Sequence, residues 1–374
     1  MRVLIVKISA LGDVVHALPV LAYLHSVEPN LEIDWLLESS FAPLLEGSRA
    51  LCHVHRLDTK LWRQPGRMLQ SSGEILGVIS ALRQRHYDVC LDLQGNSKSG
   101  LFTILSGAPL RYGFAAGNVR EWPNLLATNR RVAISDADQH ISDRALRIAR
   151  EAFPGGGQEV QVSPLQVDRA ALAAVGQRLQ QHRSTGRKLV LLHPGTTWKS
   201  KRLSAEFWVR LARGLAEHDE LHVLLSWGSD SELAELQNIK RRVSGLLTIW
   251  SRSSLREFVA LLAQVDLVIG GDTGPVHIAA ALGTPTVSCY RATDRLRNGP
   301  RGARHAILQS PMRCSPCLRK DCPDNEACSN SINVHEVLGA ARRMLAAAPE
   351  PAFPQSRDVK PAGIGAGSAV QARI

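Results

Sequence analysis

Long apolar runs, aromatic residues and cysteines are all scarce in this chain of 374 residues. No apolar run approaches the roughly 20 residues that a membrane-spanning helix needs. Aromatic residues make up only 5% and basic residues are dispersed, so we expect no stacking platform for nucleic acid and no nucleic-acid partner. Seven cysteines at this length do not suggest the disulfide framework of a small secreted domain.

A signal-peptide cleavage pattern is also missing from the first segment, MRVLIVKISALGDVVHALP, which is typical of a β-strand and its loop. We therefore expect a cytoplasmic protein. The net charge of +11 favours phosphorylated substrates or the anionic inner face of a membrane as partners. A basic surface without a specific partner would give the same charge.

Buried apolar segments alternate with segments of helical spacing along the chain. In the first half, strands are predicted at 2–8, 31–37 and 87–93, and helices at 16–27 and 73–85. The second half repeats the pattern, with strands at 188–194, 221–227, 246–250, 266–272 and 284–290 and helices at 168–182, 205–218, 231–243, 255–264 and 274–282. Such alternation predicts an α/β protein with parallel sheets covered on both faces.

A Gly- and Pro-rich stretch at 153–165 separates the two halves. We predict domains at 1–158 and 159–345, followed by a disordered tail at 346–374 that is rich in Ala, Gly and Pro. The length fits two domains of about 150–180 residues. Two doubly wound domains would face each other across a cleft, with ligands at the carboxyl ends of the strands.

The first predicted strand ends in the small-residue turn SALGDVVH, which places Asp13 near the opening of a helix. Gly12 would let a ligand approach the backbone closely. Asp13 is a candidate general base that accepts a proton from an acceptor hydroxyl. The alternative is a helix cap, worth about 1 kcal/mol.

Two loops of the second half have the chemistry of anion sites. In HPGTTWKSKR, threonine hydroxyls, backbone N–H groups and lysines such as Lys201 suit a diphosphate. In GGDTGPVH, Asp272 and Thr273 end a buried strand, and the following helix presents its N-terminus, a ready anion site. A solvated basic loop and an ordinary capped helix are the structural alternatives, and His277 could equally be a packed core residue.

Four cysteines near the C-terminus have a spacing that can bind a metal. Cys314, Cys317, Cys322 and Cys328 form a C-x2-C-x4-C-x5-C pattern. A structural metal site, a redox pair and free thiols all remain open. At the predicted diphosphate loops we find no Asp-x-Asp pair, and we expect no cofactor and no essential divalent ion.

Four segments of the chain, taken in order, resemble the heptosyltransferases of lipopolysaccharide core assembly, which form glycosyltransferase family 9. These segments are KISALGDVVHALP, DLQGNSKSG, HPGTTWKSKRLSAEFW and GGDTGPVHIAAALGTP. The resemblance spans about residues 1–345 and is nearest to the branch that adds the first heptose to Kdo-lipid A. It implies the GT-B fold, in which two Rossmann-like domains face each other. It also implies inverting transfer from ADP-L-glycero-D-manno-heptose to an acceptor at the inner membrane.

Carried over by motif, the resemblance assigns roles to individual residues. Asp13 resembles the catalytic base. The donor-binding residues would be Thr196, Thr197, Lys201, Glu232, Asp272, Thr273, Gly274 and His277. The acceptor-side residues would be Lys60, Arg63, Lys98 and Arg120. A later heptosyltransferase step, a nucleotide-sugar epimerase or hydrolase on the same fold, and a non-catalytic sugar-nucleotide binder are the alternatives.

Overall fold

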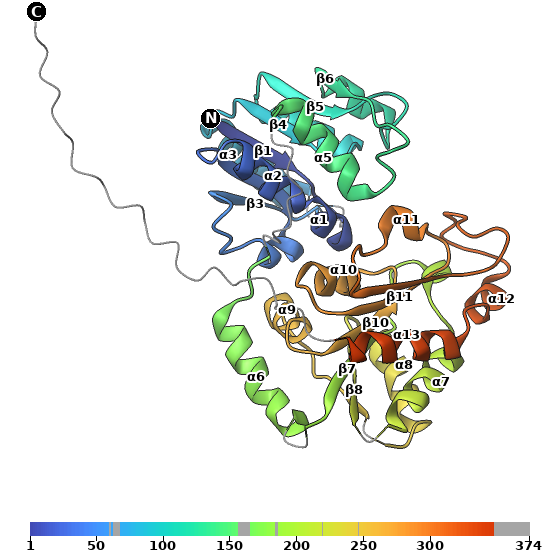
Figure 1. Cartoon of the computed structure of the whole chain (residues 1–374). Helices are drawn as coiled ribbons and strands as arrows, with labels where there is room; N and C mark the ends of the chain where they lie inside the picture. The colour runs from blue at the N-terminus through green and yellow to red at the C-terminus, as the bar shows by residue number, and fades with distance from the viewer. Residues whose placement is uncertain are drawn as a thin grey trace, which may run out of the picture.

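The computed structural model describes residues 1–59, 61–62, 68–155, 165–183, 186–218, 220–245 and 247–347. Its strands form two six-stranded sheets, one from each half of the chain. Figure 1 shows the N-terminal half, blue to green, above the C-terminal half, green to red, with helices α1 and α10 between the two sheets.

The first sheet is parallel throughout, with the strand order β3-β2-β1-β4-β5-β6. The order reverses between β1 and β4, where Val3 pairs with Val89. Both strands are almost wholly buried, as expected for a sheet covered on both faces. Its strands are β1 (Arg2–Val6), β2 (Glu32–Glu38), β3 (His53–Leu57), β4 (Val89–Asp92), β5 (Leu110–Phe114) and β6 (Arg130–Val132).

The second sheet repeats this topology with the order β12-β11-β10-β7-β8-β9. Here the order reverses between β7 and β10, where Val268 pairs with Leu191. Ligands of doubly wound folds bind beyond the carboxyl ends of the strands at such a reversal. The strands are β7 (Lys188–His193), β8 (Leu221–Leu225), β9 (Leu247–Ile249), β10 (Leu267–Gly271), β11 (Thr286–Tyr290) and β12 (His305–Gln309).

Helices cover both faces of each sheet. In the first half they are α1 (Leu11–Ala17), α2 (Pro19–Val27), α3 (Met68–Gln84), α4 (Ser97–Leu105) and α5 (Ile141–Ala152), with 3-10 helices η1 (Ser39–Leu44) and η2 (Trp122–Leu126). In the second half they are α6 (Arg169–Arg183), η3 (Lys199–Lys201), α7 (Ala205–Ala216), α8 (Asp230–Arg241), α9 (Leu255–Leu262), α10 (Gly274–Ala281), α11 (Arg295–Asn298), α12 (Asn325–Asn330) and α13 (Val334–Ala346).

One hydrophobic cluster runs from the first half into the second. It joins side chains of α1, α2 and α5 to side chains of α6, α9 and α10. The opposite faces have separate clusters, one under α3 and α4 and one under α7, α8 and α13. No helix in the part of the chain that the structure describes is long and apolar enough to cross a membrane.

The α/β class and the two parallel sheets are confirmed, with exceptions in detail. The predicted helix at 16–27 is wrong at its start, because the chain is helical from Leu11 and Pro19 opens a second helix there. Strands β3, β5, β6 and β12 do not follow from the sequence pattern, since they carry polar residues and are only partly buried. The domain boundary at 158/159 and the tail from 348 onward lie outside the described residues.

Candidate active site

The helices that follow the central strands of the two sheets meet at the domain interface. A Cβ atom on Gly12 of α1 would lie 2.8 Å from His277 Cδ2, and one on Gly274 of α10 would lie 2.8 Å from Leu11 Cδ2. Only the absence of a side chain at both positions allows this approach. The predicted sites of the two halves are therefore brought together by α1 and α10.

Asp13 lies in the first turn of α1, next to Gly12, and is partly buried. Its Oδ2 atom accepts a hydrogen bond from the Ala10 N–H group at 3.3 Å. Asp13 is therefore not the N-cap residue, which is Ala10, but from the third helical position it caps the Ala10 N–H group. Gly12, the residue before Asp13, packs against His277 of the second half. Asp13 therefore follows directly, in the sequence, a residue of the domain interface.

Lys7 is a buried cation beside Asp13 that the sequence analysis missed. Its Nζ atom donates to the Leu93 carbonyl oxygen at 2.8 Å. Burial lowers the pKa of Lys7, while the negative charges of Asp13 and Asp92 act in the opposite direction. A lysine near the end of an otherwise apolar strand is the sequence signal that could have identified it.

The DLQG segment holds the loop between β1 and α1 in place. Gln94 Oε1 accepts hydrogen bonds from the N–H groups of Ile8 at 2.8 Å and Ser9 at 3.1 Å. Asp92 Oδ1 accepts from the N–H groups of Gln94 and Gly95, both at 2.9 Å. This motif therefore positions the backbone that leads to Asp13.

The predicted acceptor residues are described only in part. Lys98, in the first turn of α4, forms an ion pair with the buried Glu38 at 3.0 Å and donates to Thr59 Oγ1 at 3.1 Å. Arg120 is exposed, and its backbone N–H group donates to the Gly95 carbonyl oxygen at 3.0 Å. Lys60 and Arg63 lie outside the described residues.

On the donor side, Asp272 joins two of the other predicted residues. Lys201 Nζ lies 2.6 Å from Asp272 Oδ2, and His277 Nε2 lies 3.0 Å from Asp272 Oδ1. Burial disfavours the charged form of Asp272, but the hydrogen bond and charge of His277 and the charge of Lys201 outweigh it, so its pKa lies well below the usual range. Asp272 is therefore an ionised carboxylate that holds Lys201 and His277 in place.

Two further residues, absent from the sequence predictions, complete the surroundings of Asp272. Thr293 Oγ1 donates to Asp272 Oδ2 at 2.7 Å, and Asn298 Nδ2 approaches the same oxygen at 3.4 Å. Both lie beyond β11 in the chain, so only the folded sheet brings them to the end of β10.

The remaining threonines and glycine of the donor loops are placed by β7 and α10. Thr196 and Thr197 follow β7, with Thr197 exposed, and Gly274 is the first residue of α10. Thr273 precedes α10, and its buried Oγ1 atom has no hydrogen-bond partner among the described residues. A polar atom of this kind at a helix N-terminus is suited to bind a ligand oxygen.

Glu232 lies in the first turn of α8, close to the loop that follows β7. Its Oε2 atom accepts hydrogen bonds from the N–H groups of Gly228 at 2.7 Å and Ser229 at 3.2 Å. A Cβ atom on Gly195 would lie only 2.4 Å from Glu232 Oε1. The loop that carries Thr196 and the Glu232 carboxylate are thus in direct contact.

A Gly195→Ala variant is expected to weaken ADP binding at least ~10-fold, because the new methyl group displaces the Glu232 carboxylate. Isothermal titration with ADP measures this effect. Gly228→Ala is the matched control, since its Cβ would lie at an ordinary 3.5 Å from the same carboxylate. Equal ADP affinity in the two variants would contradict the role of this contact.

Three histidine rings from both halves cluster at the α1–α10 contact. The His16 and His277 ring centroids are 4.4 Å apart, and His16 and His140 are 5.2 Å apart. His140 Nδ1 accepts from the Ser142 N–H group, so its Nε2 donates to the Gly299 carbonyl oxygen at 3.0 Å. Burial, with smaller effects from nearby charges, lowers the pKa of His16 well below 6.5 and that of His140 to about 4.

We expect the free energy of unfolding to fall as the pH decreases from about 6.5 to 4. In this window the unfolded chain binds protons that the folded His140 does not, so the stability is fully present above pH 6.5. A shift from 6.5 to about 4 corresponds to roughly 3 kcal/mol. His140→Asn keeps a helix-capping oxygen without a titrating ring. Its urea-unfolding free energy should therefore fall less steeply with acidification, and parallel pH profiles would contradict this account.

The four clustered cysteines are free thiols. Cys314 is exposed, Cys317 and Cys322 are partly exposed, and Cys328 is buried beside Arg291. The described residues contain no group of three or more histidine, cysteine or acidic side chains arranged to hold a metal ion. The structure therefore does not support the metal site that the spacing allowed.

Two Rossmann-like domains that face each other, each with a parallel six-stranded sheet, are the architecture of the GT-B fold. Residues 75–327 match the model of glycosyltransferase family 9 (heptosyltransferase), and the chain belongs to this family. It is 32% identical to lipopolysaccharide heptosyltransferase 1 of Pseudomonas aeruginosa over 86% of this chain and 87% of that enzyme. The family, the fold and the enzyme class predicted from the sequence are confirmed.

Solved structures show the same architecture. The Escherichia coli heptosyltransferase WaaC with ADP has a TM-score of 0.75 at 24% identity, covering 92% of this chain and 100% of that chain. WaaC with ADP-2-deoxy-2-fluoro heptose has a TM-score of 0.71 at 25% identity, covering 92% and 99%.

Proposed function

We propose that this glycosyltransferase transfers L-glycero-D-manno-heptose from ADP-heptose to the Kdo-lipid A inner core in lipopolysaccharide biosynthesis. Its similarity to a lipopolysaccharide heptosyltransferase 1 supports heptose transfer in core synthesis. The structures of WaaC with ADP and with an ADP-heptose analogue support a nucleotide-sugar donor. The reaction would take place at the cytoplasmic face of the inner membrane, because the acceptor is lipid-linked and the donor is a nucleotide sugar.

The α1–α10 contact is the observation that carries this proposal. Helix α1, which carries Asp13 in its first turn, packs through Gly12 against His277 at the start of α10, and this supports a base on the first half acting on a donor bound to the second. In the proposed step, the acceptor oxygen attacks the anomeric carbon while its proton passes to Asp13. The bond from that carbon to the diphosphate oxygen breaks, its electrons leave with ADP, and this single displacement inverts the anomeric centre.

Stabilisation of the leaving ADP is assigned to groups around Asp272. The Lys201 ammonium group, held by Asp272, supplies positive charge, and the N-terminus of α10 supplies free N–H groups. Thr196, Thr197 and Thr273 add hydroxyl donors, and Glu232 would contact the nucleoside. These cationic and dipolar groups can neutralise a diphosphate without a divalent ion.

The acceptor would bind on the first half. Lys98 and Arg120, with Lys60 and Arg63, supply cations for the carboxylates and phosphates of a Kdo-lipid A. Lys98 is already paired with Glu38, so an incoming carboxylate would share this cation rather than meet a free one.

Incubation of the enzyme with ADP-heptose and Kdo2-lipid A, analysed by mass spectrometry, tests the proposal. The expected result is a mass increase of one heptose that the Asp13→Ala variant does not produce. Transfer only to an acceptor that already carries heptose would reassign the enzyme to a later core step. Rapid donor turnover without any acceptor would overturn the transferase proposal in favour of a hydrolase or epimerase.

A further inference from the structure

An exposed apolar patch lies on the first half, outside the proposed catalytic residues. Leu101 and Ile104 of α4 are 52% and 46% exposed, and Trp122 and Leu126 of η2 are 70% and 71% exposed. The two helices pack against each other, because a Cβ atom on Gly100 would lie 3.2 Å from the Cβ of Ala127. We call these four side chains the α4–η2 patch.

Helix α4 has apolar side chains on two sides, because it buries Phe102 in the core and still leaves two aliphatic side chains in solvent. The polar Ser99 and Thr103 are buried beside Phe102, whereas Leu101 and Ile104 are exposed. A surface helix of a globular protein ordinarily turns its apolar side chains to the core and its polar side chains to water. The outward side of α4 is therefore suited to an apolar environment.

The 3-10 helix η2 turns a polar residue inward and apolar residues outward. Asn124 is fully buried and donates to Asp92 Oδ2 at 2.6 Å and to the Asn96 carbonyl oxygen at 3.0 Å. The polar residue thus anchors η2 to the fold, and Trp122 and Leu126 are left in solvent. Burying these two side chains would stabilise a complex without disturbing the fold.

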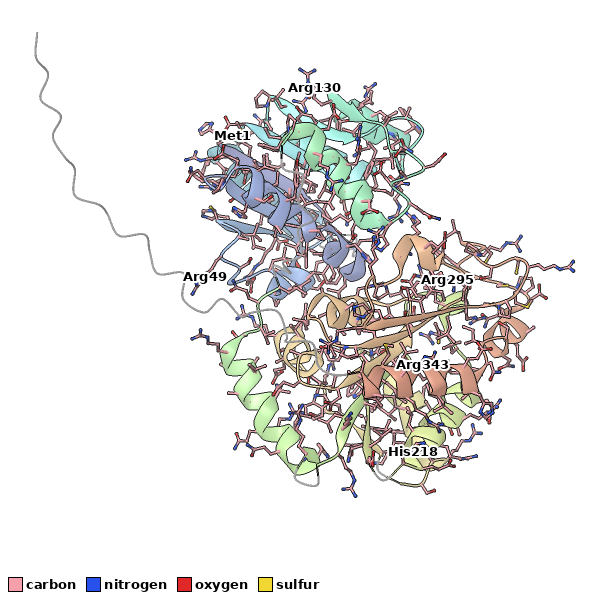
Figure 2. All side chains as sticks on the ribbon, viewed as in Figure 1. Met1, Arg49, Arg130, His218, Arg295 and Arg343 are labelled. Atoms are coloured by element: carbon pink, nitrogen blue, oxygen red, sulfur yellow. The ribbon has the colours of Figure 1, made fainter. Side chains whose placement is uncertain are left out.

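Arginines held by backbone contacts surround the patch. Arg83 donates to Leu105 O at 3.2 Å, Arg111 donates to Ala127 O at 2.8 Å, and Arg131 donates to Leu125 O at 2.9 Å. Arg130 is exposed beside Arg131, and Figure 2 shows it at the outer end of the first half, away from the second half. The one acid adjoining Trp122, Glu121, is engaged by the N–H and hydroxyl groups of Ser97.

We infer that the α4–η2 patch docks on an anionic phospholipid bilayer. Aliphatic and tryptophan side chains rimmed by arginines match the acyl boundary and the phosphate headgroups of such a surface. The position of α4 supports a bilayer as the partner. Lys98, on the acceptor side, and Ile104 of the patch are separated by about 9 Å along the helix axis. Docking on a bilayer rests on the proposed function in one respect, since a lipid-linked acceptor keeps its lipid in the bilayer while its saccharide reaches the site.

Flotation of the full-length protein with vesicles tests the inference. Vesicles of phosphatidylethanolamine and phosphatidylglycerol should bind the protein, and vesicles of phosphatidylcholine alone should bind it at least ~10-fold less. Trp122→Ser combined with Leu126→Ser should lower binding at least ~10-fold. Leu296→Ser combined with Leu318→Ser, two side chains of the second half that are each 58% exposed, should bind as the wild type does.

Unchanged vesicle binding by the patch variant, or no binding by the wild type, would overturn the inference. A dimer that the patch variant loses in sedimentation, without vesicle binding, would also overturn it and assign the patch to a second copy of the chain. Thermal unfolding checks that the variants fold.

With a delipidated acceptor the patch variant should transfer heptose normally, and with a vesicle-embedded acceptor it should not. If the wild type transfers to neither acceptor but binds vesicles through the patch, the proposed function fails and the docking surface stands.

Discussion

Replacing Asp13 with asparagine is expected to lower kcat at least ~100-fold while ADP affinity stays within about threefold of the wild type. The amide cannot accept a proton from the acceptor hydroxyl, but its oxygen can still accept the hydrogen bond from the Ala10 N–H group. Steady-state kinetics with saturating donor, together with ADP titration, measure the two effects separately.

The pair Asp13→Asn and Asp13→Ala distinguishes catalysis from capping. A residue that only caps α1 would tolerate asparagine, and the alanine variant alone would lose stability, by about 1 kcal/mol. A proton acceptor would fail equally in both variants. Retention of wild-type turnover by Asp13→Asn would therefore show that Asp13 is a helix cap and that another group is the base.

Replacing Lys201 with methionine is expected to lower kcat/KM by about 100- to 1000-fold, comparable to the loss of one group that stabilises a developing negative charge. Both ADP affinity and kcat should fall, because the ammonium group would contact the diphosphate in the bound and the reacting states. Lys199→Met is the matched control, since Lys199 lies two residues away on η3, is exposed, and should tolerate the change.

Because Lys201 is ion-paired with Asp272, the Lys201→Met variant is expected to lose stability as well as activity. Removing one partner of a buried pair costs roughly 3–5 kcal/mol, because the other charge loses its compensation. The double variant Lys201→Met/Asp272→Asn should regain most of this stability, as measured by urea unfolding, without regaining activity. Recovery of activity together with stability would show that Lys201 only balances the charge of Asp272.

Much of the fold could be predicted from the sequence because its signals are local. The buried strands β1, β7 and β10 are continuous apolar runs, and their ends coincide with glycine-rich or small-residue turns. The positions of Asp13, Lys201 and Asp272 in the loops or first turns after these strands were predictable for the same reason, whereas their roles in catalysis and binding stay predictions. In a parallel sheet, residues in these positions converge at one edge.

Other features depend on contacts between distant segments and could not be predicted in this way. Strands β5 and β6 are partly polar and only partly buried, and they form because the sheet offers them backbone hydrogen-bond partners. Thr293 reaches Asp272 only because β10 and β11 are neighbours. The four cysteines have the spacing of a metal site, but the fold does not bring them together as ligands.

The sequence by itself determined the α/β class, the two repeated halves and the identity of the residues at the strand ends, because hydrophobic periodicity and turn chemistry act over a few residues. Only the tertiary structure decided that α1 and α10 meet through Gly12 and Gly274, and that Lys201 is paired with Asp272. The orientation of α4 and η2, with polar residues inside and Trp122 outside, was likewise decided there. The physical reason is that the burial, the ion pairs and the pKa of a residue depend on the residues packed around it, and those residues are far apart in the chain.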